Sequence, residues 1–201
     1  KGQVVASAKG VQGKELRLAV QNPTLWDTSN PYLYDMKVSL TKDGKVVDDV
    51  KSYTAFRKIS SKRDANGIMR MQLNNKNLFQ YGPLDQGWWP DGLYTAPTDE
   101  ALLYDIVKTK DWGFNMIRKH VKVEPARWYY HCDKEGILVW QDMPSGDMGN
   151  QWAPHTYNGG TDKERSSASI ANYYQEWKEI MDLCVSHPSV VVWVPFNEAW
   201  G

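Results

Sequence analysis

The chain has 201 residues, enough for one large domain or for a small domain with part of another. Its 24 Lys and Arg residues balance 24 Asp and Glu residues, so no net charge attracts a nucleic acid or an anionic membrane. Every apolar run is shorter than the ~18 residues that a membrane span needs. The composition therefore argues against nucleic-acid and membrane partners.

The ends of the sequence and its two cysteines give little information on location. The chain opens with Lys-Gly-Gln, without an initiator Met or a signal-like stretch, so we expect the native N-terminus to lie upstream. Localisation stays open, with the periplasm and secretion both compatible. Cys132 and Cys184 have no paired spacing, which indicates small buried side chains and not a disulfide or a metal clip. No cofactor is predicted.

Residues 1–60 have the pattern of a β-sandwich that is incomplete at its start. Short alternating runs are separated by turn residues such as Lys42-Asp43-Gly44-Lys45. Residues 61–68 are polar and turn-forming, and they predict a linker to a second domain over 69–201. The expected strands of the first domain are 16–20, 34–40, 46–50 and 53–59.

From residue 69 onward, apolar runs of strand length alternate with amphipathic segments of helix length. Residues 69–73 and 78–81 predict a hairpin that leads into a first strand ending near Gly82. Thr98 is the expected N-cap of the first helix, and Gly136 is expected to close the second. The later elements are a helix to Asp111, a strand 115–120, a helix 124–134, a strand 137–143, a helix 169–186 and a strand 190–197.

This β-α-β-α-β-α-β order predicts parallel strands with crossover helices. An open Rossmann-like sheet and the first half of an eight-stranded barrel both fit the order. No G-x-G-x-x-G follows the first strand, which weakens a nucleotide-binding interpretation.

Polar residues end every predicted strand of the second region. In either architecture the active site gathers at the carboxyl ends of the strands, so we expect these side chains to lie near one another. Carboxylates, a guanidinium and an amide are the groups that bind a polyhydroxylated ligand. They are Asp85 and Gln86, Arg118 and His120, Gln141 and Asp142, and Asn197 and Glu198.

The run Val191 to Glu198 is the most specific of these strand ends. Strict alternation points Asn197 and Glu198 to opposite faces, but Pro195 predicts a bulge that re-aims both toward the pocket. The alternative is that Glu198 merely leaves the sheet and is solvated.

Four stretches in order resemble glycoside hydrolase family 2. Residues 186–198 are similar to the strand that ends in the family's catalytic Asn-Glu, and 25–34 resemble the strand entry of its immunoglobulin-like domain. Residues 112–118 and 130–140 resemble its second and third barrel strands. The resemblance implies an immunoglobulin-like β-sandwich followed by the first half of a (β/α)8 TIM barrel.

The same resemblance assigns Glu198 as the general acid/base of a retaining β-glycosidase, most similar to a β-galactosidase. Asn197 then binds the sugar 2-hydroxyl, and Arg118 and His120 belong to the substrate site. Retention requires a second carboxylate about 5–5.5 Å away as nucleophile. In the family it lies on a later strand, so the 201 residues alone are expected to be inactive.

Aromatic and acidic neighbours complete the predicted site. Asp85, Asp142, Trp89 and Trp200 are candidate substrate-binding residues, with Trp152 as a further platform, although each Trp can equally serve in packing. The sugar and its linkage stay open. A non-catalytic carbohydrate-binding relative is the alternative function. A half barrel leaves an unpaired strand edge, so the chain alone is expected to aggregate or to form a homo-oligomer.

Overall fold

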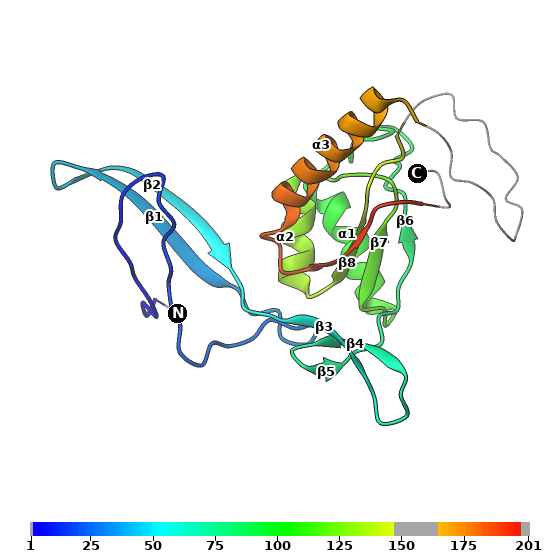
Figure 1. The fold of residues 1–201 in the computed structure, drawn as a ribbon, viewed down its shortest axis with the longest axis horizontal. Helices are drawn as coiled ribbons and strands as arrows, with labels where there is room; N and C mark the ends of the chain where they lie inside the picture. The colour runs from blue at the N-terminus through cyan, green and yellow to red at the C-terminus, as the bar shows by residue number, and fades with distance from the viewer. Residues whose placement is uncertain (1, 147–164, 198–201) are drawn as a thin grey trace, which may run out of the picture.

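The computed structural model describes residues 2–146 and 165–197. Within that part of the chain, an antiparallel region precedes a parallel β/α unit, and Figure 1 shows the long hairpin projecting away from that unit. The described helices include none that is long and apolar enough to cross a membrane. The elements are β1 (Tyr34–Lys42), β2 (Lys45–Thr54), β3 (Ile59–Arg63), β4 (Met69–Leu73), β5 (Lys76–Asn77), β6 (Leu84–Asp85), α1 (Asp99–Asp111), β7 (Met116–Lys119), α2 (Ala126–Glu135), β8 (Leu138–Asp142), α3 (Ser167–Cys184) and β9 (Val190–Val194).

The β1–β2 hairpin confirms the predicted turn. Its register runs from Tyr34 opposite Thr54 to Lys42 opposite Lys45, and Asp43 and Gly44 both have positive φ, as a tight hairpin turn requires. The strand predicted over residues 16–20 is wrong, because these residues have no regular structure. Almost every residue of β1 and β2 is exposed, so no second layer covers the hairpin among the described residues.

The β3–β4–β5 sheet occupies the predicted boundary region. Asp64 closes the β3–β4 turn, since its carboxylate accepts hydrogen bonds from the backbone N–H groups of Asn66 and Ile68. Residues 61–63 therefore pair with β4, and the division of the chain into domains stays a prediction. The second strand of the hairpin was expected over residues 78–81, but the strand that pairs with β4 is the two-residue β5.

The β/α unit confirms the predicted alternation. In the described residues the parallel sheet has the order β6-β7-β8-β9, with helices between successive strands. Thr98 Oγ1 accepts the Ala101 N–H at 3.1 Å, and Gly136 ends α2 in the left-handed conformation, as expected of both. The first parallel strand lies at Leu84–Asp85, slightly later than predicted. The described sheet is open, so residues 2–146 and 165–197 form no closed barrel.

Alternation along the strands divides the core into two apolar clusters in the described residues. Ile117 and Val139 face the helices and pack with α1 and α2. Met116 and Leu138 face the other side and are covered by Trp26 and Leu73. The Trp26 indole is fully buried, and its N–H donates to the carbonyl oxygen of Asp133 at 2.7 Å. The loop before the hairpin is therefore fixed to the amino ends of β7 and β8.

A buried carboxylate joins the hairpin to the β/α unit. Asp133 Oδ2 accepts hydrogen bonds from the Tyr53 hydroxyl and from His187 Nδ1, both at 2.7 Å. Its Oδ1 accepts the Ser189 N–H at 2.9 Å. A carboxylate can only accept here, which places the imidazole proton on Nδ1 of His187. These contacts tie the end of β2 to the turn that begins β9.

Tyr53→Phe tests this junction. Loss of a donor to a buried charged acceptor is expected to lower the free energy of unfolding by about 1–3 kcal/mol. Burial and the Asp133 charge raise the pKa of Tyr53 above its ordinary 10.0. The unfolded state then ionises first, so the contribution of Tyr53 is complete below pH 10.0 and is lost as the pH rises beyond it.

Denaturant unfolding of the protein that carries this chain, repeated at several alkaline pH values, measures both effects. Tyr53→Phe should lose less stability than the wild type as the pH rises. The control is Tyr174→Phe, because Tyr174 is 72% exposed on α3. Identical alkaline slopes for wild type and Tyr53→Phe would contradict the assignment.

Candidate functional site

The carboxyl ends of β7, β8 and β9 bring three of the predicted residues into contact. Arg118 forms a forked pair with Asp142, with Nε to Oδ1 at 2.9 Å and Nη2 to Oδ2 at 2.8 Å. The same Nη2 donates to Asn197 Oδ1 at 2.8 Å. The sequence prediction that these strand ends converge is therefore supported for Arg118, Asp142 and Asn197.

The three side chains of the cluster differ in their exposure to solvent. The Asp142 side chain is fully buried, whereas the Arg118 side chain is 28% exposed. Asn197 is 8% exposed. A ligand at this edge of the sheet therefore meets the guanidinium first, while the carboxylate stays behind it.

Val121, which contacts the cluster, has a strained backbone conformation. Val121 has a φ of 44°, a conformation that a β-branched residue rarely adopts. Its N–H points to Asp142 Oδ2 at 3.3 Å. Strain of this kind persists only where surrounding contacts impose it.

Asp85 lies on the other face of the sheet from this cluster. It pairs in register with Lys119, whereas Leu84 pairs with Arg118, and successive residues of a strand point to opposite faces. The Asp85 carboxylate binds Lys119 Nζ at 2.6 Å. The expectation that Asp85 joins Arg118 at the site is therefore not met.

Lys119 belongs to a buried ion cluster behind the site, which the sequence analysis missed. Glu124 Oε1 lies 2.9 Å from Lys119 Nζ and 3.0 Å from Lys122 Nζ. All three of these side chains are at most 3% exposed. The ammonium of Lys119 also lies over the Trp128 ring at 4.4 Å from its centroid. The charge cluster Lys119–Lys122–Glu124–Asp85 fixes the loop after β7.

Gln141 adds neutral hydrogen bonds to the same loop. The Tyr129 hydroxyl donates to Gln141 Oε1 at 2.6 Å, and Gln141 Nε2 donates to the Lys122 carbonyl oxygen at 2.8 Å. Burial raises the pKa of Tyr129 well above its ordinary value, so the phenol stays a donor. The Gln141 side chain therefore points to the helix side of the sheet.

His120 and Trp89 occupy different positions. His120 directly follows the last residue of β7, Lys119. Its Nδ1 is buried, and the described residues offer it no hydrogen-bond partner. Trp89 instead packs against the helix-side cluster, with its backbone paired to Leu93. This contact agrees with a packing role for Trp89, which was the alternative to a role as a sugar platform.

Glu198 and Trp200 lie outside the described residues, as does Trp152. Asn197 is described and reaches Arg118, although the irregularity in β9 is not where Pro195 predicts it. The bulge lies between the pairs Val139–Val190 and Trp140–Val192. One extra residue on β9 therefore shifts its alternation before the strand ends.

Metal ligands and reactive thiols do not gather at this edge in the part of the chain that is described. No group of three His, Cys, Asp or Glu side chains there is placed to hold a metal ion. Cys132 and Cys184 are free and fully buried in the helix-side cluster, as predicted. Burial raises the pKa of both thiols, with the Asp133 charge adding to the effect.

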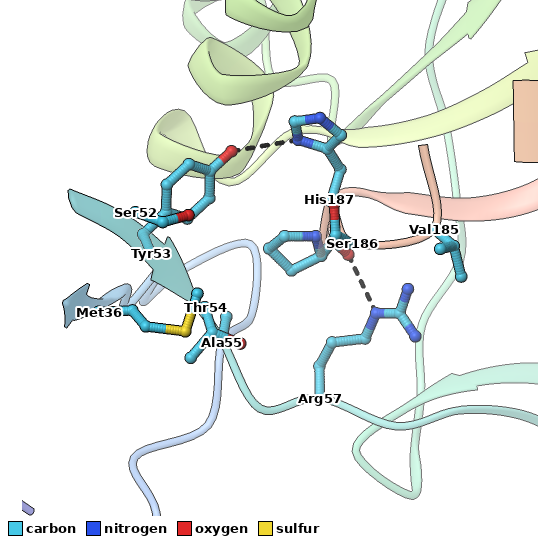
Figure 2. A pocket seen from close by; sticks show the side chains of 10 residues that line it. Met36, Ser52, Tyr53, Thr54, Ala55, Arg57, Val185, Ser186 and His187 are labelled. Atoms are coloured by element: carbon cyan, nitrogen blue, oxygen red, sulfur yellow. Dashed lines mark hydrogen bonds between the residues drawn. The ribbon is translucent and has the colours of Figure 1, made fainter. Parts of the chain in front are cut away.

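A separate hollow of about 490 Å³ lies between the hairpin and the turn before β9. Figure 2 shows Tyr53 pointing to His187, and Arg57 pointing to the turn that carries Ser186. Arg57 donates from Nε to the Pro188 carbonyl oxygen at 3.0 Å and from Nη2 to that of Val190 at 2.8 Å. The hollow adjoins the amino end of β9, so it is distinct from the cluster at the carboxyl ends.

The N-terminal part of the chain, residues 1–57, matches the family model "Glycosyl hydrolases family 2". A putative beta-glucuronidase of Formosa agariphila is 29% identical over 184 residues, covering 90% of this chain and 20% of the relative. A beta-galactosidase of Halalkalibacterium halodurans is 28% identical, covering 100% of this chain and 20% of that protein. The chain is therefore similar to glycosyl hydrolases family 2 over residues 1–57, and to a named beta-glucuronidase and a named beta-galactosidase over most of its length.

Two solved beta-glucuronidase structures superpose on this chain. The b-glucuronidase from Ruminococcus gnavus superposes with a TM-score of 0.78 over 98% of this chain and 31% of that chain, at 22% identity. A Bacteroides uniformis beta-glucuronidase gives 0.71 over 90% of this chain and 20% of that chain, at 24% identity. These likenesses establish a shared fold. The chain spans about a fifth of the length of the curated relatives it matches.

Glu124→Gln tests the ion cluster behind the site. The substitution leaves two buried ammonium groups without their shared carboxylate, so we expect the free energy of unfolding to fall by about 3–5 kcal/mol. Urea unfolding of the protein that carries this chain measures the loss. The matched control is Glu15→Gln, since the Glu15–Arg17 pair is 72% and 89% exposed. Equal losses for the two variants would show that Glu124 is no more than a surface partner.

Proposed function

We propose that this chain is part of a retaining β-glycosidase and that Glu198 is its general acid/base. The family-model match over residues 1–57 and the similarity to named beta-glucuronidases and beta-galactosidases support the reaction class. The observation that carries the proposal is the contact of Arg118 with both Asp142 and Asn197 at the carboxyl edge of a parallel sheet. Asn197 immediately precedes Glu198, so this contact fixes the residue next to the proposed acid.

The proposed fold is the first half of a (β/α)8 TIM barrel preceded by part of an immunoglobulin-like β-sandwich. The parallel order β6-β7-β8-β9 with intervening helices supports the barrel, and the β1–β2 hairpin supports the sandwich. In barrel enzymes the catalytic groups lie at the carboxyl ends of the strands. Arg118, Asp142 and Asn197 lie at those ends.

The proposed mechanism uses two carboxylates in a double displacement. Glu198 protonates the departing glycosidic oxygen while a nucleophilic carboxylate, outside these 201 residues, attacks the anomeric carbon. Glu198 then removes a proton from the water that hydrolyses the glycosyl-enzyme. Such an acid needs a raised pKa, and a nucleophile carboxylate nearby is proposed to raise it. Asn197 is proposed to bind the sugar 2-hydroxyl, and His120 and Trp200 to contact the substrate.

The proposed substrate is a terminal β-linked sugar, with a β-galactoside as the first candidate. A β-glucuronide is the second, because similar proteins carry that name and the Ruminococcus gnavus enzyme was solved with D-glucuronic acid. The chain is 28% identical to a named beta-galactosidase and 27% identical to the Bacteroides fragilis beta-glucuronidase. These nearly equal identities support both sugars as candidates. No cofactor is part of the proposal.

Glu198→Gln in the full-length protein tests the acid/base role. A series of aryl β-galactosides and β-glucuronides with leaving groups of increasing acidity is assayed across pH. Loss of general acid catalysis is expected to lower kcat/KM by about 100- to 10,000-fold for poor leaving groups. The loss should shrink as the leaving group becomes more acidic, since such phenols depart without protonation.

The exposed Glu15→Gln variant is the control and should keep wild-type kinetics. An equal loss for every leaving group would remove Glu198 from the acid role. Glycan binding without hydrolysis by the wild type would instead favour the non-catalytic carbohydrate-binding alternative.

A further inference from the structure

Asp142 binds the groups around it, but its own side chain is buried behind them. Its carboxylate accepts from Arg118 Nε and Nη2 and from the Val121 N–H. Its side chain is 0% exposed. A sugar that reaches this edge therefore touches Arg118 or Asn197 before it can touch Asp142.

The contact between Arg118 and Asn197 determines which way the Asn197 amide faces. A guanidinium has hydrogens to donate and no acceptor, so the amide must present Oδ1 to Arg118. The Nδ2 group is then on the opposite branch of the amide, where it can only donate. The ligand atom bound by Asn197 is therefore a hydrogen-bond acceptor.

We propose that Asp142 is a positioning residue that sets the orientation of the Asn197 amide through Arg118. The inference rests on the proposed function, since it concerns the same site. It revises the role expected of Asp142, from a substrate ligand to the anchor of two groups that face the substrate. The sugar hydroxyl at Asn197 accepts a hydrogen bond from Nδ2.

Two features of Asp142 support a positioning role over simple charge balance. Its pairing with Arg118 is forked, which fixes the plane of the guanidinium as well as its location. Its third contact is with the strained Val121, whose φ is 44°. One carboxylate thus fixes both the β7 side chain and the loop that follows it.

Asp142→Asn is the matched substitution, because it keeps the shape and removes one acceptor. The amide places two hydrogens where Arg118 or Val121 now donates, so the guanidinium loses its forked partner. A small misplacement of this kind is expected to lower kcat/KM of the full-length enzyme by about 100-fold. Asp142→Glu, which keeps the charge, should recover part of the loss.

A double-mutant cycle with Asn197→Ala separates positioning from a merely structural effect. If Asp142 acts through Asn197, Asp142→Asn should cost only a few-fold in the Asn197→Ala background. The same small cost is expected on an aryl 2-deoxyglycoside, which lacks the hydroxyl that Asn197 is proposed to bind. Additive losses in the cycle, or an equal loss on both substrates, would overturn the inference.

Asp27→Asn is the control for loss of an anchoring carboxylate elsewhere. Asp27 Oδ1 accepts from the backbone N–H groups of Ser29 and Asn30. That loop packs against Gly136, before the amino end of β8. Asp27→Asn is expected to lower the melting temperature but to leave kcat/KM unchanged.

The cycle also distinguishes failure of the inference from failure of the proposed function. If the wild type hydrolyses no aryl glycoside, the four proteins of the cycle are titrated with galactose and glucuronate by calorimetry. Coupling between positions 142 and 197 in Kd would keep the positioning role and remove the hydrolase. Absence of both hydrolysis and binding would overturn both.

Discussion

Opposite orientation of successive residues in β7 is the constraint on which the rest of the β/α unit depends. Met116 and Arg118 face one side of the sheet, and Ile117 and Lys119 face the helices. One four-residue strand therefore contributes to both apolar clusters, to the candidate site and to the ion cluster behind it. A shift of register by one residue would place Arg118 among the helices and Lys119 at the site.

The sequence predicts the order of the β/α elements well because each signal there is local. Thr98 and Gly136 act within one helical turn, and β7, β8 and β9 are distinguished by being shorter than the helices between them. The antiparallel region is harder to predict, because a strand needs a partner. Residues 16–20 alternate like a strand, but no described strand pairs with them. Alternation alone therefore predicts more strands than the described residues form.

The convergence of the candidate site residues was predictable to the extent that position along a strand determines which way a side chain faces. Arg118, Asp142 and Asn197 were found from their places at strand ends. Asp85 was placed wrongly because β6 is only two residues long, so its register with β7 decides which face it occupies. Lys119, Lys122 and Glu124 were missed for a different reason. Charged residues are rarely fully buried, so composition alone assigns them to the solvated surface.

The buried ion cluster explains how a strained loop can persist beside the site. Buried ion pairs contribute little net stability compared with apolar packing, but the directions of their contacts specify one arrangement. Lys122 binds Glu124 through its ammonium group, and its carbonyl oxygen accepts from Gln141. Both contacts hold the residue next to Val121. With Asp142 bound to the Val121 N–H from the other face, the left-handed conformation is fixed from both sides of the sheet. The geometry around Arg118 is therefore imposed by buried charged side chains that do not have to contact a ligand.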